Sequence, residues 1–263
     1  MNVEVLEPHG FCAGVKGALS IARANPSAYC LHELVHNEQV VERLRSGGMK
    51  FVDDVSEVPE GEAVVFSAHG VSPAVREAAA KRRLRILDAT CPFVAKVHRD
   101  ARAFAEAGLD VVVIGNRRHA EVAGIVGEVD SSRVYVYPEL PPPGARIGVV
   151  SQTTMNADEV AATVESLRSR YQVETSAQVC HATKERQDAV RNFHGDALVV
   201  LGGANSSNTR RLAEVARCPA YRVASMDELR ALDLRGVATV GVTAGASTPE
   251  DFLHEAVAFL ESL

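Results

Sequence analysis

Three cysteines occupy equivalent places along the 263-residue chain. Cys12, Cys91 and Cys180 each lie where an apolar run ends and an amphipathic helical pattern begins. The gaps between them are 78 and 88 residues, and 83 residues follow the last. This near-regular spacing predicts three similar lobes, each of which offers one thiolate to a shared metal centre. Three sulfur ligands leave a four-coordinate centre one open position, which is what a catalytic metal needs.

Other roles for these cysteines stay open at this point. A cysteine is often a small buried hydrophobe, and a zinc-stabilised structural protein could use the same three residues. Disulfides are not expected, because the chain has five cysteines and its N-terminal sequence shows no signal peptide. Cys30 and Cys218 lack the strand-to-helix context, so we expect structural roles for them.

The composition is that of an ordinary globular protein. The chain is 46% hydrophobic and 24% charged, and its net charge of −6 argues against a nucleic-acid-binding surface. No apolar run is long enough to cross a bilayer, so we expect a cytoplasmic protein without a membrane segment. Neither GxxxxGK[ST] nor GxGxxG after a strand is present, which argues against P-loop nucleotide hydrolysis and against a dinucleotide cofactor.

Predicted strands and helices alternate along the chain, which is typical of parallel α/β proteins. Strands are predicted over residues 3–7, 63–67, 85–89, 110–115, 146–151, 197–202 and 239–243. Helices are predicted, among others, over residues 73–83, 157–171, 208–217 and 249–263, where apolar residues recur at spacings of three and four.

The loops that follow these strands are the second chemical feature. Residues 67–73, 115–124, 151–158, 202–208 and 243–251 are rich in Gly, Ser, Thr, Asn and His. They lie at the carboxyl ends of strands, where open α/β sheets bind ligands, and the helix N-termini that follow them suit phosphate groups. The simpler interpretation is that such residues cap helices. Asn208 and Thr248 could do so, but Ser206, Ser207 and Ser247 would be left over.

Three of the nine histidines, His36, His69 and His119, lie in or beside the predicted loops. Partly charged imidazoles could donate hydrogen bonds to a diphosphate near neutral pH. A satisfied or surface histidine is the simpler alternative. Zinc is the other alternative, although the usual C-x-x-C and H-x-x-x-H spacings are missing.

A set of ordered motifs extends from residue 3 to the C-terminus. The motifs are HGFCAGV, HELVHN, FSAHGVS, DATCP.V.KVH, HAEV.G, SQTT, C.AT..RQ, NSSN and GVTAGAST.ED. Together they resemble the LytB (IspH) family of 4-hydroxy-3-methylbut-2-enyl diphosphate reductases. The resemblance implies a trefoil of three pseudo-symmetric α/β lobes, each with a small, mostly parallel sheet, around a central iron–sulfur cluster. We expect the lobes to span residues 14–91, 92–176 and 177–263, the last completed by the N-terminal strand within residues 1–13.

The resemblance also implies the cofactor and the site. Cys12, Cys91 and Cys180 would hold one [4Fe–4S] cluster per chain, whose open fourth iron takes the substrate hydroxyl. The implied diphosphate-binding residues are His36, His69, His119, Ser206, Ser207, Asn208 and Ser247. Glu121 and Thr153 would lie near the hydroxymethyl group and relay protons. The implied partners are a small allylic diphosphate and an electron donor such as ferredoxin or flavodoxin.

The implied reaction is the last step of the non-mevalonate isoprenoid pathway. It removes the hydroxyl of (E)-4-hydroxy-3-methylbut-2-enyl diphosphate and gives isopentenyl and dimethylallyl diphosphate. Removal of an allylic hydroxyl needs two electrons, two protons and a Lewis acid, and a cluster with an open iron supplies the electron path and the Lewis acid. A buried Glu121, its pKa raised, would supply a proton at neutral pH. The alternative for Glu121 is a solvated glutamate at a helix start.

Two motifs depart from the family pattern. Where GHxxHPEVEG is usual, the chain reads GNRRHAEVAG, so that Asn116, Arg118, Ala120 and Ala123 replace a histidine, a small residue, a proline and a glutamate. Where GSxNSSN is usual, Gly203 leaves out one hydroxyl. Three alternatives therefore stay open: a divergent paralogue that acts on another allylic diphosphate, a redox-neutral cluster-dependent dehydratase or hydratase, and a non-catalytic phosphate-binding protein.

Overall fold

The computed structural model describes residues 1–263, which form two compact units. Unit 1 consists of Met1–Lys16, Val35–Arg43 and His181–Leu263. Unit 2 consists of Gly17–Leu34 and Leu44–Cys180. The chain therefore passes from unit 1 to unit 2 and back more than once, and neither unit is a single continuous segment.

Unit 2 contains two four-stranded sheets in which every pairing is parallel. The first sheet has the order β3-β2-β4-β5, with β2 at Tyr29–Leu31, β3 at Lys50–Val52, β4 at Ala63–Phe66 and β5 at Arg85–Asp88. The second sheet has the order β7-β6-β8-β9, with β6 at Asp110–Ile114, β7 at Val134–Val136, β8 at Arg146–Ser151 and β9 at Gln172–Thr175.

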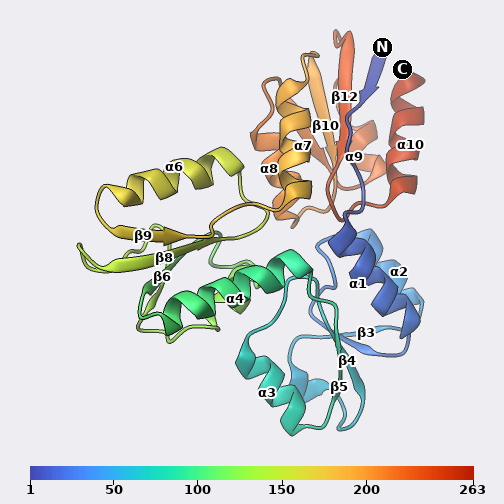
Figure 1. The fold of residues 1–263 in the computed structure, drawn as a ribbon. Helices are drawn as coiled ribbons and strands as arrows, with labels where there is room; N and C mark the ends of the chain where they lie inside the picture. The colour runs from blue at the N-terminus through green and yellow to red at the C-terminus, as the bar shows by residue number, and fades with distance from the viewer. The chain divides into compact units, whose positions relative to one another are not determined.

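Unit 1 contains the third sheet, which is also parallel and has the order β11-β10-β12-β1. Its strands are β1 (Asn2–Val5), β10 (Ala197–Leu201), β11 (Ala220–Val223) and β12 (Thr239–Ala244). The N-terminal strand, blue in Figure 1, lies beside β12, with Asn2 opposite Thr239. In the first two sheets the second strand along the chain flanks the first on one side and the third flanks it on the other. In the third sheet β10, β11 and β12 repeat this order, and the N-terminal strand β1 takes the fourth place. The three sheets are thus one topology repeated.

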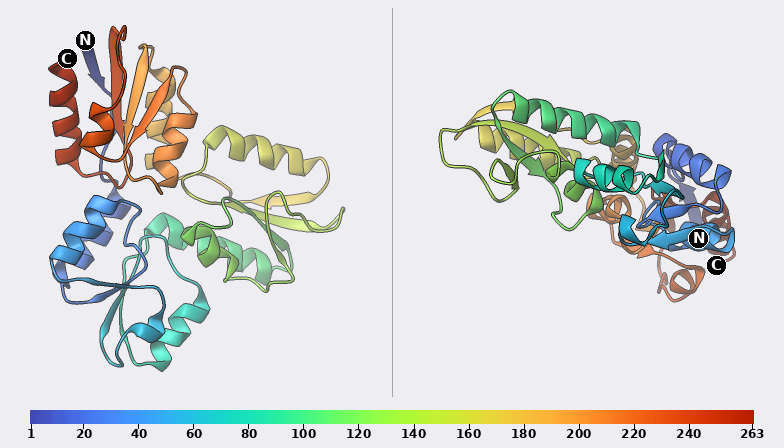
Figure 2. Two further views of the ribbon diagram at one scale, coloured as in Figure 1. Left: turned by 180° about the vertical axis from the view of Figure 1, so that it is seen from behind. Right: turned by 90° about the horizontal axis from the view of Figure 1, so that it is seen from below.

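Helices connect the parallel strands, as crossover connections require. They are α1 (Ala13–Ala24), α2 (Glu38–Ser46), α3 (Pro73–Lys81), α4 (Pro92–Glu106), α5 (Ala120–Val126), α6 (Ala157–Arg168), α7 (His181–Asn192), α8 (Ser207–Glu214), α9 (Met226–Arg230) and α10 (Glu250–Glu261), with the 3₁₀ helix η1 at Val55–Glu57. In none of these helices do length and apolar character suffice to cross a bilayer. In unit 1, α10 packs beside β1, so the two termini lie together at one end of the third sheet (Figure 2).

The apolar cores lie on both faces of the sheets. In the second sheet, Val112 and Val149 face α6, whereas Val111, Val113 and Val150 face α4 and α5. This alternation follows from the two-residue period of a strand. Because helices cover both faces, the central strands are nearly continuous runs of buried apolar residues.

The predicted α/β class with three lobes that each hold a small parallel sheet is confirmed, and all seven predicted strands are present. Five further strands, β2, β3, β7, β9 and β11, escaped prediction. They are only three or four residues long, and all but β2 lie at sheet edges, where segments such as Gln172–Thr175 mix polar and apolar residues. The lobe boundaries 14–91, 92–176 and 177–263 stay a prediction.

Candidate functional site

The predicted site residues lie in loops or helix starts after the carboxyl ends of strands. In unit 2, they are His69 after β4, Cys91 after β5, His119 and Glu121 after β6, Thr153 after β8 and Cys180 after β9. In unit 1, they are Cys12 after β1, Ser206, Ser207 and Asn208 after β10, and Ser247 after β12. His36 precedes α2 and belongs to unit 1. Since the strands of each sheet are parallel, the residues of one sheet share one edge.

Glu121 is the buried acid of unit 2. It lies in the first turn of α5 and is 2% exposed. Its Oε1 accepts a hydrogen bond from the Thr153 backbone N–H (2.7 Å), and its Oε2 accepts one from the Thr153 hydroxyl (3.1 Å). Burial raises the pKa of Glu121 to about 7, against the opposing effect of the two Thr153 hydrogen bonds. The alternative of a solvated glutamate is therefore wrong, and this carboxyl can hold or release a proton near neutral pH.

His119 caps the helix that carries Glu121. Its Nδ1 accepts a hydrogen bond from the Glu121 backbone N–H at 3.2 Å. An Nδ1 that accepts cannot carry the proton, so the neutral imidazole carries it on Nε2. The cap therefore makes the Nε2 of His119 a hydrogen-bond donor.

His69 lies next to His119 within unit 2. The two ring centroids are 5.5 Å apart and the rings meet edge to face, with an interplanar angle of 88°. The Nδ1 of His69 is 3.3 Å from the Ser67 hydroxyl oxygen, which restrains the ring. Two imidazoles this close form a suitable pair of donors for one anionic ligand.

Cys91 and Cys180, the two predicted ligand cysteines of unit 2, are tied by their backbones to the loops that carry these residues. The Cys91 N–H donates to the carbonyl of Ala68, beside His69, at 3.1 Å. The Cys180 N–H donates to the carbonyl of Thr153 at 3.0 Å. Cys91 is also the N-cap residue of α4, where the positive end of the helix dipole favours a thiolate.

Cys12 is held in a similar way in unit 1. Its N–H donates to the carbonyl of Ala246 at 3.2 Å, and its own carbonyl accepts from the Lys16 N–H in the first turn of α1. The neighbouring Ser247 hydroxyl donates to the carbonyl of His36 at 3.2 Å. One loop therefore links Cys12, Ser247 and His36.

Ser206, and not Asn208, caps α8. The Ser206 hydroxyl oxygen accepts from the Thr209 N–H at 3.2 Å, because Ser206 stands one residue before the helix and Asn208 stands inside its first turn. The expectation that Thr248 is a cap is also wrong: Pro249 occupies the N-cap position of α10, and the Thr248 hydroxyl donates to the carbonyl of Leu201.

The amide of Asn208 is the clearest sign of a polar ligand in unit 1. Asn208 is 4% exposed, and neither its Nδ2 nor its Oδ1 has a hydrogen-bond partner in the protein. Buried amides are normally hydrogen-bonded, because an unpaired buried polar group is costly. An amide that can both donate and accept is suited to hydrated or phosphate-bearing ligands.

The remaining cysteines differ chemically from Cys12, Cys91 and Cys180. None of the five is in a disulfide. Cys30 is fully buried, and burial raises the pKa of its thiol to about 12. Burial also raises the pKa of Cys218. Both therefore stay protonated near neutral pH, which fits the structural roles expected for them.

Two supporting residues inside the quoted motifs escaped sequence reasoning. Gln152 is buried, and its side chain accepts from the Asn116 N–H and donates to the Thr154 hydroxyl. Arg186 is buried and donates to the carbonyls of Gly10 and Ala182, both at 2.8 Å. Their positions in SQTT and C.AT..RQ were the available signal, but hydrogen bonds between distant segments cannot be read from spacing.

The departures from the family motifs have local structural roles. The Asn116 Oδ1 accepts from the Arg118 N–H at 3.0 Å, so Asn116 stabilises the turn before His119. Gly203 packs against the segment that carries His36: a Cβ on Gly203 would lie 2.7 Å from the His36 carbonyl oxygen and 3.1 Å from the Cα of Asn37. This chain therefore has no room for the usual serine there unless the backbone moves.

Gly203→Ser is accordingly expected to lower the free energy of unfolding by about 1–3 kcal/mol, because the new Cβ overlaps backbone atoms that cannot rotate away. Chemical denaturation measures the effect. Gly17→Ser is the matched control, since a Cβ at Gly17 meets no atom within 4 Å. A Gly203→Ser protein as stable as the parent would contradict the close packing of Gly203 on His36.

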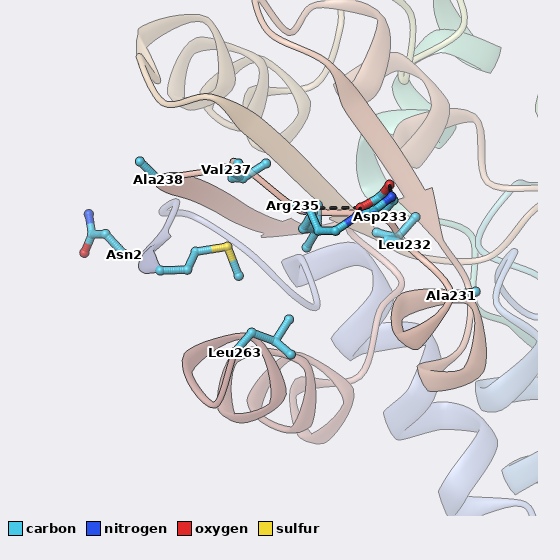
Figure 3. A pocket seen from close by; sticks show the side chains of 11 residues that line it. Asn2, Ala231, Leu232, Asp233, Arg235, Val237, Ala238 and Leu263 are labelled. Atoms are coloured by element: carbon cyan, nitrogen blue, oxygen red, sulfur yellow. Dashed lines mark hydrogen bonds and ion pairs between the residues drawn. The ribbon is translucent and has the colours of Figure 1, made fainter.

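One open hollow in unit 1 lies away from these residues. It has a volume of about 1010 Å³ and is lined by Met1, Asn2, residues 231–238 and Leu263 (Figure 3). These residues lie at the amino ends of β1 and β12, opposite to the loops described above. Its charged side chains, Asp233 and Arg235, pair with each other.

Comparisons with known proteins cover nearly the whole chain. A family model described as "LytB protein" matches residues 3–261. The 4-hydroxy-3-methylbut-2-enyl diphosphate reductase of Alcanivorax borkumensis is 40% identical over 100% of this chain and 92% of its own length. The enzyme of the same name from Phenylobacterium zucineum is 43% identical over 95% of this chain and 86% of its own length. The solved E-1-hydroxy-2-methyl-but-2-enyl-4-diphosphate reductase from Plasmodium falciparum has a TM-score of 0.92 and 31% identity, and the match covers 98% of this chain and 87% of that one.

Proposed function

The chain belongs to the LytB protein family, and we propose on this basis that it reduces (E)-4-hydroxy-3-methylbut-2-enyl diphosphate to isopentenyl and dimethylallyl diphosphate. The observation that carries the proposal is the buried Glu121 with a pKa of about 7, hydrogen-bonded to Thr153. An exposed or fully ionised carboxylate would be a poor proton donor at neutral pH, whereas this one is suited to the task.

The proposed cofactor is one [4Fe–4S] cluster held by Cys12, Cys91 and Cys180. Three observations support the fit: these cysteines are partly exposed, none is in a disulfide, and each lies next to the start of a helix. Thiolates are the ligands that such clusters prefer. When bound, a cluster with an open iron would provide the electron path and a Lewis acid for the C–O bond.

The diphosphate is proposed to bind His36, His69, His119, Ser206, Ser207, Asn208 and Ser247. In unit 2, the adjacent rings of His69 and His119 offer donors, of which the His119 Nε2–H is set by its cap. In unit 1, the buried amide of Asn208 supports the assignment because it has no partner in the protein. Binding energy at the diphosphate would position the distant hydroxymethyl end.

Glu121 and Thr153 are proposed to deliver protons. In the overall reaction the C–O bond breaks, two electrons enter, one proton leaves with the oxygen as water and one proton is added to carbon. A hydroxyl both donates and accepts. At the observed contact the Thr153 hydroxyl can donate to an ionised Glu121 and can accept from a protonated one. The pair can therefore hand on a proton without moving its heavy atoms.

The electrons must come from outside the chain, because a two-electron reduction consumes a reductant in every turnover. We propose a one-electron donor protein such as ferredoxin or flavodoxin. The deciding experiment is anaerobic turnover of the hydroxylated five-carbon diphosphate by protein purified with its iron, with a chemical reductant in place of the donor protein. Formation of both allylic and homoallylic five-carbon diphosphates is expected. Conversion without reductant would indicate a redox-neutral dehydratase, and no conversion at all would contradict the proposal.

Thr153→Val is expected to lower turnover by about tenfold to a hundredfold, because the relay hydroxyl is lost while the backbone bond to Glu121 stays. The lost hydrogen bond is one of the two that lower the pKa of Glu121. The pKa should therefore rise further and move the alkaline limb of the pH–rate profile to higher pH. Thr153→Ser is the control, since it keeps the hydroxyl. Equal pH–rate profiles for Thr153→Val and Thr153→Ser would show that the Thr153 hydroxyl has no role in proton transfer.

A further inference from the structure

A cluster of three ionisable side chains, His98, Glu128 and Arg102, lies in unit 2, outside the residues assigned above. The His98 Nδ1 is 2.9 Å from the Glu128 Oε1. Arg102 donates to the Glu128 Oε2 from Nε (3.1 Å) and Nη2 (2.7 Å). The side chains of His98 and Glu128 are 8% and 3% exposed, whereas that of Arg102 is 50% exposed. The His98–Glu128 pair is thus buried, and Arg102 covers it from the surface.

The contacts determine how the His98 ring is protonated. An ionised Glu128 can only accept hydrogen bonds, so the Nδ1 of His98 must donate. Burial lowers the pKa of His98 despite the opposing effect of Glu128, so the ring is neutral near neutral pH and its Nε2 carries no proton. This Nε2 is buried without a hydrogen-bond partner. The inner end of the ring therefore acts through packing, not through a hydrogen bond.

The ring packs between the loop that carries His69 and the helix that carries Glu121. A Cβ on Gly70 would lie 3.0 Å from the His98 Nε2, and a Cβ on Gly124 would lie 2.9 Å from its Cε1. Gly70 follows His69 directly, and Gly124 is one turn after Glu121 in α5. At both positions an added Cβ would press on the ring, which makes His98 a spacer between the loop and α5.

A second contact holds the loop and α5 together. A Cβ on Gly127, which ends α5, would lie only 2.4 Å from the Cβ of Ser72, the N-cap residue of α3. The loop between β4 and α3 therefore packs against α5 at two points: through the His98 ring of α4, and directly where Ser72 meets Gly127. His69 belongs to the loop, and His119 caps α5. The volume of the His98 ring between Gly70 and Gly124 therefore affects the distance between the His69 and His119 rings.

We propose that His98, oriented by Glu128, is a positioning residue that sets the spacing between His69 and His119 and through it the affinity for the diphosphate. This inference rests on the proposed function, because it assigns the two rings to diphosphate binding. His98 itself does not touch the reacting atoms. Its contribution is the ring volume between Gly70 and Gly124.

Two variants separate ring volume from charge pairing. His98→Asn keeps an N–H donor close to the position of Nδ1 and so retains a partner for Glu128, but it removes the inner half of the ring. Gly124→Ala keeps the ring and adds a methyl group in contact with it, at a helical position where alanine is intrinsically favourable. Each is expected to raise KM, and the Kd for inorganic pyrophosphate, about tenfold while kcat changes less than about threefold.

The double variant tests the spacer directly. In His98→Asn/Gly124→Ala the added methyl group occupies part of the vacated space, so KM and the pyrophosphate Kd should return toward the parent values. Arg102→Ala is the control, because Arg102 contacts Glu128 but not the glycines; it should lower thermal stability and leave KM unchanged. Visible absorption of each purified holoprotein checks that iron content is equal.

The outcomes are distinct. Loss of thermal stability without any change in KM or pyrophosphate Kd would show that His98 is only structural and would overturn the proposal, as would a double variant worse than the sum of its parts. If the parent binds pyrophosphate but does not reduce the hydroxylated diphosphate, the proposed function fails, and the pyrophosphate Kd values still decide on His98. If the parent neither binds pyrophosphate nor reduces the hydroxylated diphosphate, both proposals fail; if it turns over the substrate without binding pyrophosphate, the KM values decide on His98.

Discussion

Serine at position 12, 91 or 180 is expected to abolish iron binding and turnover together. In the proposed site each of the three cysteines supplies one of the three protein ligands, and a serine hydroxyl is a poor replacement for a thiolate in an iron–sulfur cluster. Each backbone N–H at these positions donates to a carbonyl in the structure, and serine keeps that hydrogen bond. The polypeptide fold should therefore survive. Iron and sulfide content, visible absorption and turnover of anaerobically purified protein measure the effect.

Cys218→Ser is the control for the three substitutions. Cys218 is partly exposed, and its thiol stays protonated because burial raises its pKa; its loss should change neither iron content nor turnover. Cys30→Ala is a second control for the fully buried thiol. A parent protein that carries zinc and no iron would contradict the cluster, and a Cys180→Ser protein with full iron content would remove Cys180 from the ligand set.

The sequence was sufficient to predict the places of the cysteines and the central strands. Both depend on local patterns: an apolar run that ends at Cys91 marks the end of β5, and the helical period that follows marks α4. The match to the LytB family model confirms the family that the ordered motifs predicted, and the three parallel sheets confirm the α/β class. The short edge strands carry little apolar periodicity and could not be found in this way.

The chemistry of the site depends on contacts that spacing does not encode. Glu121 and Thr153 are 32 residues apart, and only the folded second sheet brings β6 and β8 side by side so that their following loops meet. The cap of α8 shows that prediction can also fail for a purely local reason. Ser206 and Asn208 are both good capping residues, and the choice between them depends on where the helix begins, within two residues.

The burial of Glu121 makes the stability of the protein depend on pH in a defined direction. Its pKa is about 7 in the folded protein against 4.5 for the ordinary carboxyl, so between these values the folded protein retains a proton that the unfolded chain has released. Stability from this group is fully present below pH 4.5 and is lost as the pH rises through about 7, by about 3 kcal/mol in total. Denaturation curves at pH 5 and pH 8 should show the loss in the parent and not in a variant without this carboxyl.

Glu121→Gln is expected to keep substrate binding and lose most turnover, by about a hundredfold to ten-thousandfold. The amide retains the shape of the side chain: its oxygen accepts from the Thr153 N–H, and its NH₂ group donates to the Thr153 hydroxyl. It cannot deliver a proton. The pyrophosphate Kd should change less than about threefold, since the carboxyl is not among the proposed diphosphate ligands.

The pH–rate profile separates this role from a general weakening of the site. In the parent, turnover should fall above about pH 7 as Glu121 ionises, because the proton donor is then lost. In Glu121→Gln this alkaline limb should be absent from the residual rate. Glu139→Gln, which changes an exposed glutamate of the same unit paired with Arg117, is the matched control and should keep both the rate and the limb. A Glu121→Gln protein with the parent's rate and profile would exclude Glu121 as the acid, and the proton would then have to reach the substrate by another route.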